Sequence, residues 1–135
     1  MVKKIIRVAA ALIQNGGQYL VTQRPPGSHL ELFWEFPGGK CEEKELLEDC
    51  LKRELKEELD IDVAVGSCIK STTHEYSDRT VELYFFDCEW TGGELKAKEC
   101  HGIQWLYPRE MEPDQFPPAD QLLIQELQLR EKSKC

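Results

Sequence analysis

The sequence predicts one α+β domain, and three observations support this fold class. The chain has 135 residues, 41% of them hydrophobic and 31% charged, so it fits a single domain that buries a core without disulfides or a structural metal. Apolar β-branched segments and amphipathic segments follow one another in the order strands, helix, strands, helix, which is typical of an α+β or layered αβα domain. No apolar run approaches the roughly 18 residues that a membrane span needs. We therefore expect one domain over residues 1–135.

The first forty residues predict a hairpin, a loop and a turn. Residues 5–14 and 18–24 are apolar and β-branched, and the Asn-Gly-Gly sequence at 15–17 between them is a strong hairpin signal. The Pro-Pro-Gly sequence at 25–27 ends the strand pattern and opens a loop. Residues 34–39 predict a turn, in which the paired glycines let the backbone approach another group closely.

The rest of the chain predicts two helices and three strands. Residues 45–59 are the clearest helix, residues 63–70 and 80–90 are strands, and residues 102–107 are a short strand. A last helix follows the proline pair at 117–118. One side of this helix is expected to carry three leucines, Leu122, Leu123 and Leu127.

The helix at 45–59 carries acidic residues on its apolar side. At roughly 100° per residue, an apolar arc is formed by Leu47, Cys50, Leu51 and Leu55. Glu54 and Glu58 project into this arc and Glu57 lies at its edge, so the three carboxylates neighbour one another. They repel one another and lose hydration, and Arg53 balances only one of them. A hard divalent cation such as Mg²⁺ would balance the rest; the alternative is an exposed, glutamate-rich helix.

Residues 39–61 resemble the Nudix box. This signature is a glycine, five residues, a glutamate, seven residues, Arg-Glu, an aliphatic residue, any residue, Glu-Glu, any residue, a glycine and an aliphatic residue. Eight of its nine specified positions match here, and chance would give such a match in roughly one chain in 10⁵. The departure is Asp60, in place of a glycine that often adopts a left-handed conformation. We expect this aspartate to cost about 1 kcal/mol without loss of chemistry.

The resemblance extends to the MutT-type branch of this family over nearly the whole chain. It includes Gln23-Arg24, the lead-in at 34–40 and the closing Phe-Pro-Pro-Ala-Asp sequence at 116–120. The resemblance implies an αβα sandwich around a mixed sheet. It also implies cleavage of nucleoside triphosphates to the monophosphate and pyrophosphate.

The resemblance further implies which residues hold divalent metal ions, Mg²⁺ first and Mn²⁺ as a possibility. The ligands would be the Gly38 carbonyl with Glu54, Glu57 and Glu58. Arg53 would orient the glutamates and Glu45 would anchor the loop before the helix. Glu99 falls where the family supplies a further ligand or a general base, and the choice of base between Glu54 and Glu99 stays open because geometry decides it.

Several residues are candidates for substrate contacts. Arg24, Arg79 and Lys40 can reach phosphate or base, although each suits a solvated surface equally well. Trp34 and Phe36 would wall the base pocket, with plain core packing as the alternative.

Asp120 stands at a position where the resemblance implies base recognition. An ionised aspartate accepts a hydrogen bond from the amine of cytosine or adenine, whereas a protonated one can donate to the carbonyl of an oxidised guanine. The alternative is that Asp120 is the N-cap of the last helix.

The composition limits the kinds of partner and the cellular compartment that we expect for this protein. The formal charge of -8 argues against a nucleic-acid polymer, which recruits basic faces, but not against a single nucleotide neutralised by a bound cation. The six cysteines form no CxxC pair and suit small buried side chains in a reducing cytosol, so we expect a cytoplasmic protein without a membrane partner. A monomer and a homodimer both remain open.

The leading functional hypothesis is an Mg²⁺-dependent pyrophosphohydrolase that removes oxidised nucleotides such as 8-oxo-dGTP. A close alternative keeps this chemistry and prefers CTP, dCTP or a modified cytidine nucleotide. Cleavage of ADP-ribose or a dinucleoside polyphosphate is less favoured by the features outside the box. A hypothesis of another class is a Nudix-fold binding module without catalysis, but such modules typically lack the box glutamates that are present here.

Overall fold

The computed structural model describes residues 3–133, which form seven strands, two α-helices and two short 3₁₀ turns. The strands are β1 (Lys4–Asn15), β2 (Gln18–Gln23), β3 (Trp34–Glu35), β4 (Gly38–Lys40), β5 (Ile61–Glu75), β6 (Arg79–Gly93) and β7 (Gly102–Leu106). The helices are α1 (Leu47–Leu59) and α2 (Pro118–Ser133), and the 3₁₀ turns are η1 (Pro108–Glu110) and η2 (Pro113–Gln115).

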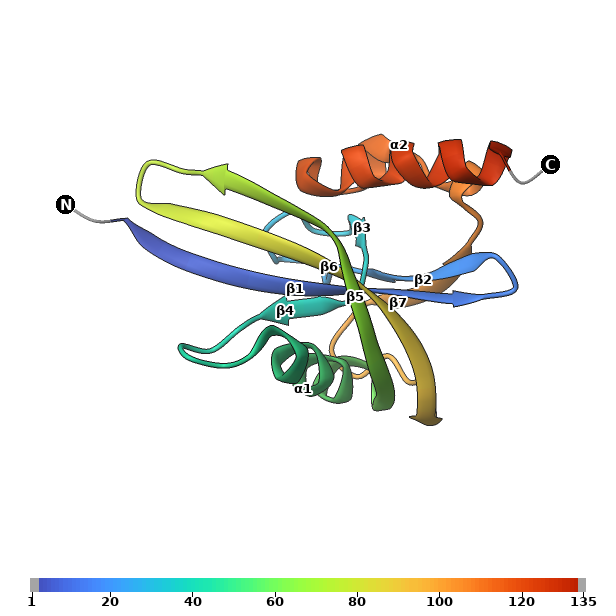
Figure 1. Ribbon diagram of the computed structural model, residues 1–135, viewed down its shortest axis with the longest axis horizontal. Coiled ribbons are helices and arrows are strands. Elements are labelled where there is room, and N and C mark those ends of the chain that lie inside the picture. Colours follow the sequence, from blue (N-terminus) through green and yellow to red (C-terminus); the bar gives the residue numbers. More distant parts are fainter. Residues whose placement is uncertain (1–2, 134–135) are drawn as a thin grey trace.

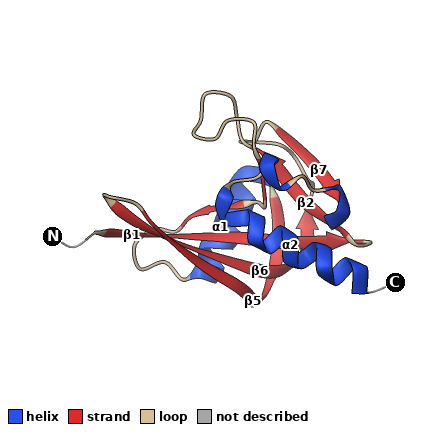
Figure 2. Ribbon diagram, turned by 90° about the horizontal axis from the view of Figure 1, so that it is seen from above, coloured by secondary structure: helices blue, strands red, loops and turns tan. Residues whose placement is uncertain are grey.

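The strands form one mixed sheet between the two helices (Figure 1). The main order is β3-β2-β1-β6-β5, with β4 added to β1 and β7 added to β2. The pairing of β1 with β6 is parallel and the other pairs are antiparallel. Helix α1 lies below the sheet and α2 above it in Figure 1, and Figure 2 shows α2 crossing the strands. The predicted α+β sandwich is therefore confirmed.

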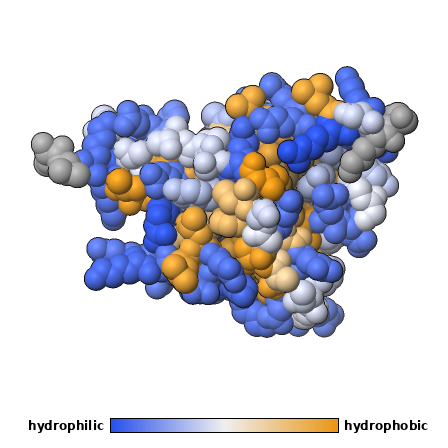
Figure 3. Space-filling model, in the orientation of Figure 1, coloured by the Kyte–Doolittle hydropathy of each residue, from blue (hydrophilic) through white to orange (hydrophobic). Residues whose placement is uncertain are grey.

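Each face of the sheet has its own apolar core. Alternate residues of β1 point to opposite faces of the sheet, so Ala9 packs towards α1 and Ala10 packs towards α2. The core under α1 includes Leu51, Leu55 and Leu59, all fully buried. The core under α2 includes Phe36, Phe85, Phe116, Leu123 and Leu127. In the view of Figure 3 the hydrophobic side chains gather at the middle of the molecule and hydrophilic ones surround them.

Most predicted elements are confirmed, with strands longer than expected. Strands β5 and β6 extend the predicted segments 63–70 and 80–90 on both sides, because the two pair with each other over their whole length. The predicted turn at 34–39 was too long, because β3 and β4 occupy its ends and leave only residues 36–37 between them. The grouping of Leu122 with Leu123 was wrong: consecutive helical residues differ by about 100°, and Leu122 is 54% exposed.

Two expectations about the whole chain have different outcomes. Within residues 3–133, no helix has the length and apolarity needed to cross a membrane. That residues 1–135 form a single domain stays a prediction.

Candidate functional site

The acidic face of α1 lies at the border of its core. Leu51, Leu55 and Leu59 are buried, while Glu54 and Glu58 on the neighbouring side are half-buried and Glu57 is exposed. The helical spacing therefore places the three carboxylates as the sequence predicted, two at the apolar border and one at its edge.

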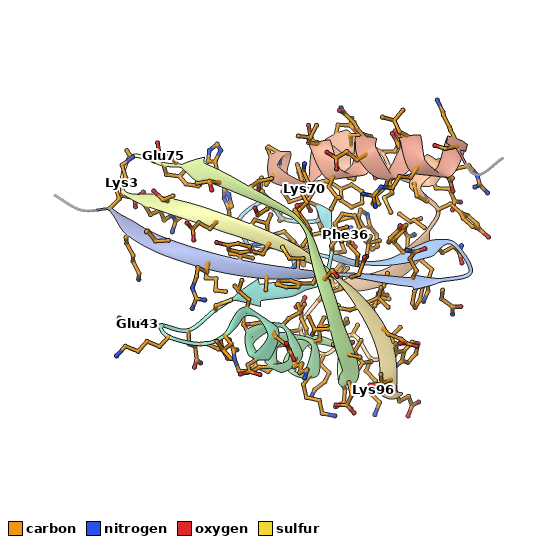
Figure 4. All side chains as sticks on the ribbon, viewed as in Figure 1. Lys3, Phe36, Glu43, Lys70, Glu75 and Lys96 are labelled. Carbon is orange, nitrogen blue, oxygen red and sulfur yellow. The ribbon has the colours of Figure 1, made fainter. Side chains whose placement is uncertain are left out.

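The loop that follows β6 is fastened to the C-terminal end of α1. The Lys98 backbone N–H donates to the Glu58 carbonyl over 3.0 Å, and the Lys96 N–H donates to the Leu59 carbonyl over 3.0 Å. Figure 4 labels Lys96 on the α1 side of the sheet, where this loop begins. These bonds bring Glu99 close enough to raise the pKa of both Glu54 and Glu58. The structure therefore unites the loop acid with the helix acids, as the sequence predicted.

Arg53 joins four parts of this site through its guanidinium. Its Nε and Nη2 each donate to the Glu45 carboxylate over 2.9 Å, and Nη2 also donates to the Lys40 carbonyl over 3.1 Å. Its Nη1 donates to Glu54 over 3.0 Å and to Glu57 over 3.4 Å. A planar guanidinium is suited to such a fork. Arg53 therefore fixes two of the acids relative to the loop before the helix.

Glu45 is an anchor in the loop before α1. The hydrogen bonds from Arg53, and then the Glu42 backbone N–H over 2.9 Å, lower its pKa to about 2. The same ion pair raises the pKa of Arg53. Both groups therefore carry their charges at neutral pH.

Glu58 and Glu54 have the opposite electrostatics. Burial, followed by repulsion from Glu35 and Glu54, raises the pKa of Glu58 to about 8, although the Gly38 backbone N–H lowers it in part. Burial also raises the pKa of Glu54, against the attraction of Arg53. We refer to the five carboxylates that interact here as the acidic cluster; they are Glu35, Glu54, Glu57, Glu58 and Glu99.

Gly38 and Gly39 let the backbone of β4 pass very close to its neighbours. A β-carbon on Gly38 would collide with the Ala9 carbonyl of β1, and a β-carbon on Gly39 would collide with the Glu54 carboxylate. The paired glycines therefore admit β4 between β1 and the acidic cluster, which is the close approach that the sequence predicted.

The chemistry of the acidic cluster suits a hard divalent cation. Burial, together with repulsion from Glu35 and Glu54, favours the neutral form of Glu58. The Arg53 guanidinium, which is bonded to Glu54, is shared with Glu45. A divalent ion with oxygen ligands would remove this repulsion. Within residues 3–133 no three acidic, histidine or cysteine side chains already converge on one point. Glu54 and Glu57, which now face Arg53, must therefore rotate for the glutamates to share an ion.

Glu35 is a member of the cluster that the sequence did not reveal. It lies in β3 between Trp34 and Phe36, which pack towards α2, so the alternation of a strand turns Glu35 to the α1 side. Burial raises its pKa, against the Arg24 guanidinium that donates to it over 3.2 Å. Alternation across 34–36 gives this result only once the pairing of β3 with β2 is known, so the sequence alone carried no signal for Glu35. Arg24 is thus bound to a carboxylate and, through Nε, to the His29 carbonyl over 2.6 Å.

Asp120 lies at the other end of this acidic region. It is the third residue of α2, which begins at Pro118, so the alternative of an N-cap is wrong. Its side chain is 5% exposed, and burial, with repulsion from Glu35, raises its pKa to about 8. Asp120 is therefore a buried carboxyl at the start of α2 that lies close enough to Glu35 for the two charges to repel each other.

The remaining candidates are dispersed. Phe36 is 3% exposed between Phe85 and Phe116 and is a core residue here, whereas Trp34 lines a cavity of about 320 Å³. The Lys40 side chain is exposed beside the site. Arg79 lies at the tip of the β5–β6 hairpin over the Tyr76 ring, so the structure does not bring it to the acidic cluster.

Comparison with known proteins agrees with this geometry. The chain is 38% identical over 122 residues to a protein of Escherichia coli (strain K12) named CTP pyrophosphohydrolase. The matched region covers 90% of each of the two chains. It is 37% identical over 129 residues to a Haemophilus influenzae protein named 8-oxo-dGTP diphosphatase, covering 94% of each chain.

Solved structures show the same fold. The solution structure of the E. coli ORF135 protein has a TM-score of 0.80 at 36% identity and covers 91% of this chain and 88% of that one. The crystal structure of the MutT protein from Methanosarcina mazei Go1 has a TM-score of 0.81 at 25% identity, covering 98% and 99%. Residues 8–126 match the NUDIX domain family, whose hydrolases generally use divalent metal ions. The resemblance seen in residues 39–61 is thereby confirmed, and the chain belongs to the Nudix hydrolases, enzymes that act on phosphorus anhydrides.

Proposed function

We propose that this protein is an Mg²⁺-dependent nucleoside triphosphate pyrophosphohydrolase. It converts a nucleoside triphosphate and water into the monophosphate and pyrophosphate. The observation that carries the proposal is the acidic cluster, in which burial and mutual repulsion raise the pKa of Glu58 to about 8 although Arg24 and Arg53 pair with other members. A divalent cation would stabilise the charged carboxylates of such a site, and a polyphosphate would bind to that cation.

Each residue of the site has a proposed role. Glu54, Glu57 and Glu58, with the Gly38 carbonyl, hold Mg²⁺, or Mn²⁺ in its place, and Glu99 adds a ligand from its loop. When bound, such an ion would neutralise charge on the phosphates and lower the pKa of a water molecule. Arg53 orients Glu54 and Glu57, with which it is in contact. The proton of the attacking water goes to Glu54 or to Glu99, both of which lie in the cluster.

The preferred substrate follows from the state of Asp120. Because its pKa is raised to about 8, this carboxyl is mostly protonated at neutral pH and can donate a hydrogen bond. A donor suits the carbonyl of an oxidised guanine, so we place 8-oxo-dGTP first, in line with the name of the Haemophilus influenzae relative. CTP or dCTP is the second candidate, because the E. coli relative at 38% identity is named CTP pyrophosphohydrolase.

Other parts of the proposal concern the setting of the reaction. The net charge of -8 favours free nucleotides over nucleic-acid polymers. We propose that the enzyme acts in the cytoplasm as one domain.

A competition panel tests the proposal. The purified chain is incubated with Mg²⁺ and 8-oxo-dGTP, dGTP, CTP, dCTP, 5-methyl-dCTP or ADP-ribose, and pyrophosphate is resolved from phosphate. We expect pyrophosphate release and the highest kcat/KM with 8-oxo-dGTP. A preference for cytidine nucleotides would select the second candidate. No turnover of any compound would contradict the proposal and favour a binding module without catalysis.

The Asp120→Asn variant tests the base contact in the same panel. Asparagine both donates and accepts at every pH, so the ranking of substrates should lose its pH dependence between pH 6 and 9. The Asp78→Asn variant, at an exposed aspartate in the turn between β5 and β6, is the control. An unchanged ranking and pH profile in Asp120→Asn would remove Asp120 from substrate recognition.

A further inference from the structure

Arg7 lies outside the Nudix box but touches the loop that the box begins with. This residue of β1 is half-buried, and its Nη2 donates to the Glu42 carbonyl over 3.0 Å and to the Glu45 carbonyl over 2.8 Å. Its own carbonyl accepts the Cys41 N–H over 2.8 Å. The loop 41–46, which connects β4 to α1, is therefore fastened to β1 near both of its ends. Figure 4 shows this loop, labelled at Glu43, projecting past the start of α1.

The segment that Arg7 holds is a strained turn. The Glu45 N–H donates to the Glu42 carbonyl over 3.0 Å, and the Glu42 N–H donates back to the Glu45 carboxylate over 2.9 Å. Between them Lys44 has φ of 67°, a left-handed conformation that costs a residue with a β-carbon free energy. Arg7 bonds the carbonyls on both sides of Lys44. Such a turn persists where its surroundings fix it, and Arg7 is one of those constraints.

The position of this strained turn determines where Arg53 lies. The Glu45 carboxylate takes two of the donors of Arg53, each over 2.9 Å, while a third donor reaches Glu54 over 3.0 Å. A displaced Glu45 would draw Arg53 away from Glu54. An unbroken series of contacts thus runs from Arg7 through the turn, Glu45 and Arg53 to the acidic cluster.

We propose that Arg7 is a positioning residue for the metal-binding glutamates, acting through Glu45 and Arg53. This inference rests on the proposed function. Arg7 has no hydrogen bond to the acidic cluster, so its effect on the glutamates is one of orientation, and the response of KM separates this effect from a substrate contact beside Lys40. Because Nη2 alone makes both bonds, a lysine ammonium can replace them in part, whereas an apolar side chain of similar length cannot.

The test compares Arg7→Met, Arg7→Lys and, as a matched control, Arg109→Met, which removes an arginine bonded to Glu131 of α2. We expect Arg7→Met to lower kcat about tenfold, as for outer partners of metal ligands, while KM for the nucleotide stays within about twofold, because no substrate contact is lost. Arg7→Lys should recover most of the loss, and Arg109→Met should show none. Faster amide hydrogen exchange confined to residues 41–46 should accompany Arg7→Met, as should a smaller rise in melting temperature on adding Mg²⁺ alone.

A double-mutant cycle separates positioning from general destabilisation. If Arg7 acts through Glu45, then Arg7→Met should cost little further kcat in the Glu45→Gln background. Additive losses, an unchanged kcat in Arg7→Met, or unchanged exchange of the 41–46 amides would each overturn the inference. Failure of the proposed function is a different result, because the wild-type chain would then release no pyrophosphate. Hydrogen exchange would still report whether Arg7 holds the loop.

Discussion

Glu54 occupies the point where the acidic cluster, Arg53 and the backbone of β4 meet. Its carboxylate accepts a hydrogen bond from Arg53 over 3.0 Å and lies where a side chain on Gly39 would stand. Burial raises its pKa, and Glu57 and Glu99 add to this rise. A carboxylate in this environment loses solvation, which costs folding free energy. We therefore expect it to be present for function and not for stability.

The Glu54→Gln variant should therefore lose activity without losing the fold. We expect kcat to fall by about 100-fold or more, because the change removes both a ligand charge and a candidate general base. The melting temperature without metal should stay the same or rise, since repulsion in the cluster decreases. Steady-state kinetics with Mg²⁺ and thermal unfolding measure the two effects. Glu48→Gln, an exposed change on the opposite side of α1, is the control, and retention of most activity in Glu54→Gln would contradict the metal assignment.

At the scale of the element, α1 ends as the sequence predicted. Asp60 has φ of 60° and ψ of 33°, the left-handed conformation, and its N–H donates to the Lys56 carbonyl over 3.1 Å. The aspartate in place of the family glycine thus raises the free energy of the left-handed residue that ends the helix, but it leaves the geometry of the helix end unchanged.

The Asp60→Gly variant should stabilise the protein. We expect the free energy of unfolding in urea to rise by about 0.5–1 kcal/mol, because glycine adopts this conformation without a β-carbon clash. Asp62→Gly is a matched control, since both aspartates pair with Lys56 but Asp62 lies in β5. It should lower the free energy of unfolding, as glycine does within a strand. A lower stability of Asp60→Gly would contradict the predicted cost.

The elements also show what a sequence can reveal. The helix at α1 and the long strands were predictable because periodicity and turn signals are local properties. Strands β3 and β4 were not, since two or three residues carry no pattern and are ordered by pairing with β2 and β1. Glu58 could be named from the Nudix box and Glu99 from the wider family resemblance, but their proximity depends on backbone bonds between the loop and α1. Glu35 was missed because its burial arises from the pairing of β3 with β2.

On the scale of the whole molecule, buried acids set the pH dependence of stability. The pKa of Glu58 rises from 4.5 to about 8 on folding and that of Asp120 from 3.8 to about 8. Between pH 4.5 and 8 the folded protein thus holds more protons than the unfolded one at these groups, so their contribution falls as pH rises through this window. Glu45, with a pKa of about 2, acts oppositely but only below pH 4.5.

The metal-free protein should therefore be less stable at pH 8 than at pH 5.5. We expect a loss of at least about 2 kcal/mol in the free energy of unfolding, since one pKa unit corresponds to about 1.4 kcal/mol. Urea unfolding in the presence of a chelator, at several pH values, measures this slope. Asp120→Asn should reduce the slope, and the control Asp78→Asn in the turn between β5 and β6 should not. A stability that is constant or rises between pH 5.5 and 8 would contradict the raised pKa values.

The parallel pairing of β1 with β6 also determines when the site can assemble during synthesis. Lys4 pairs with Arg79 and Ile13 with Cys88, so β1 must wait for a partner that leaves the ribosome 75 residues later. Closing so large a loop is slow and entropically costly. Strand β4 and the whole of α1 lie within that loop, and Glu99 follows it. A nascent chain that stops before β6 therefore carries the complete Nudix box but no sheet partner for β1 on that side. Catalytic competence arises only after β6 and the loop with Glu99 have been synthesised.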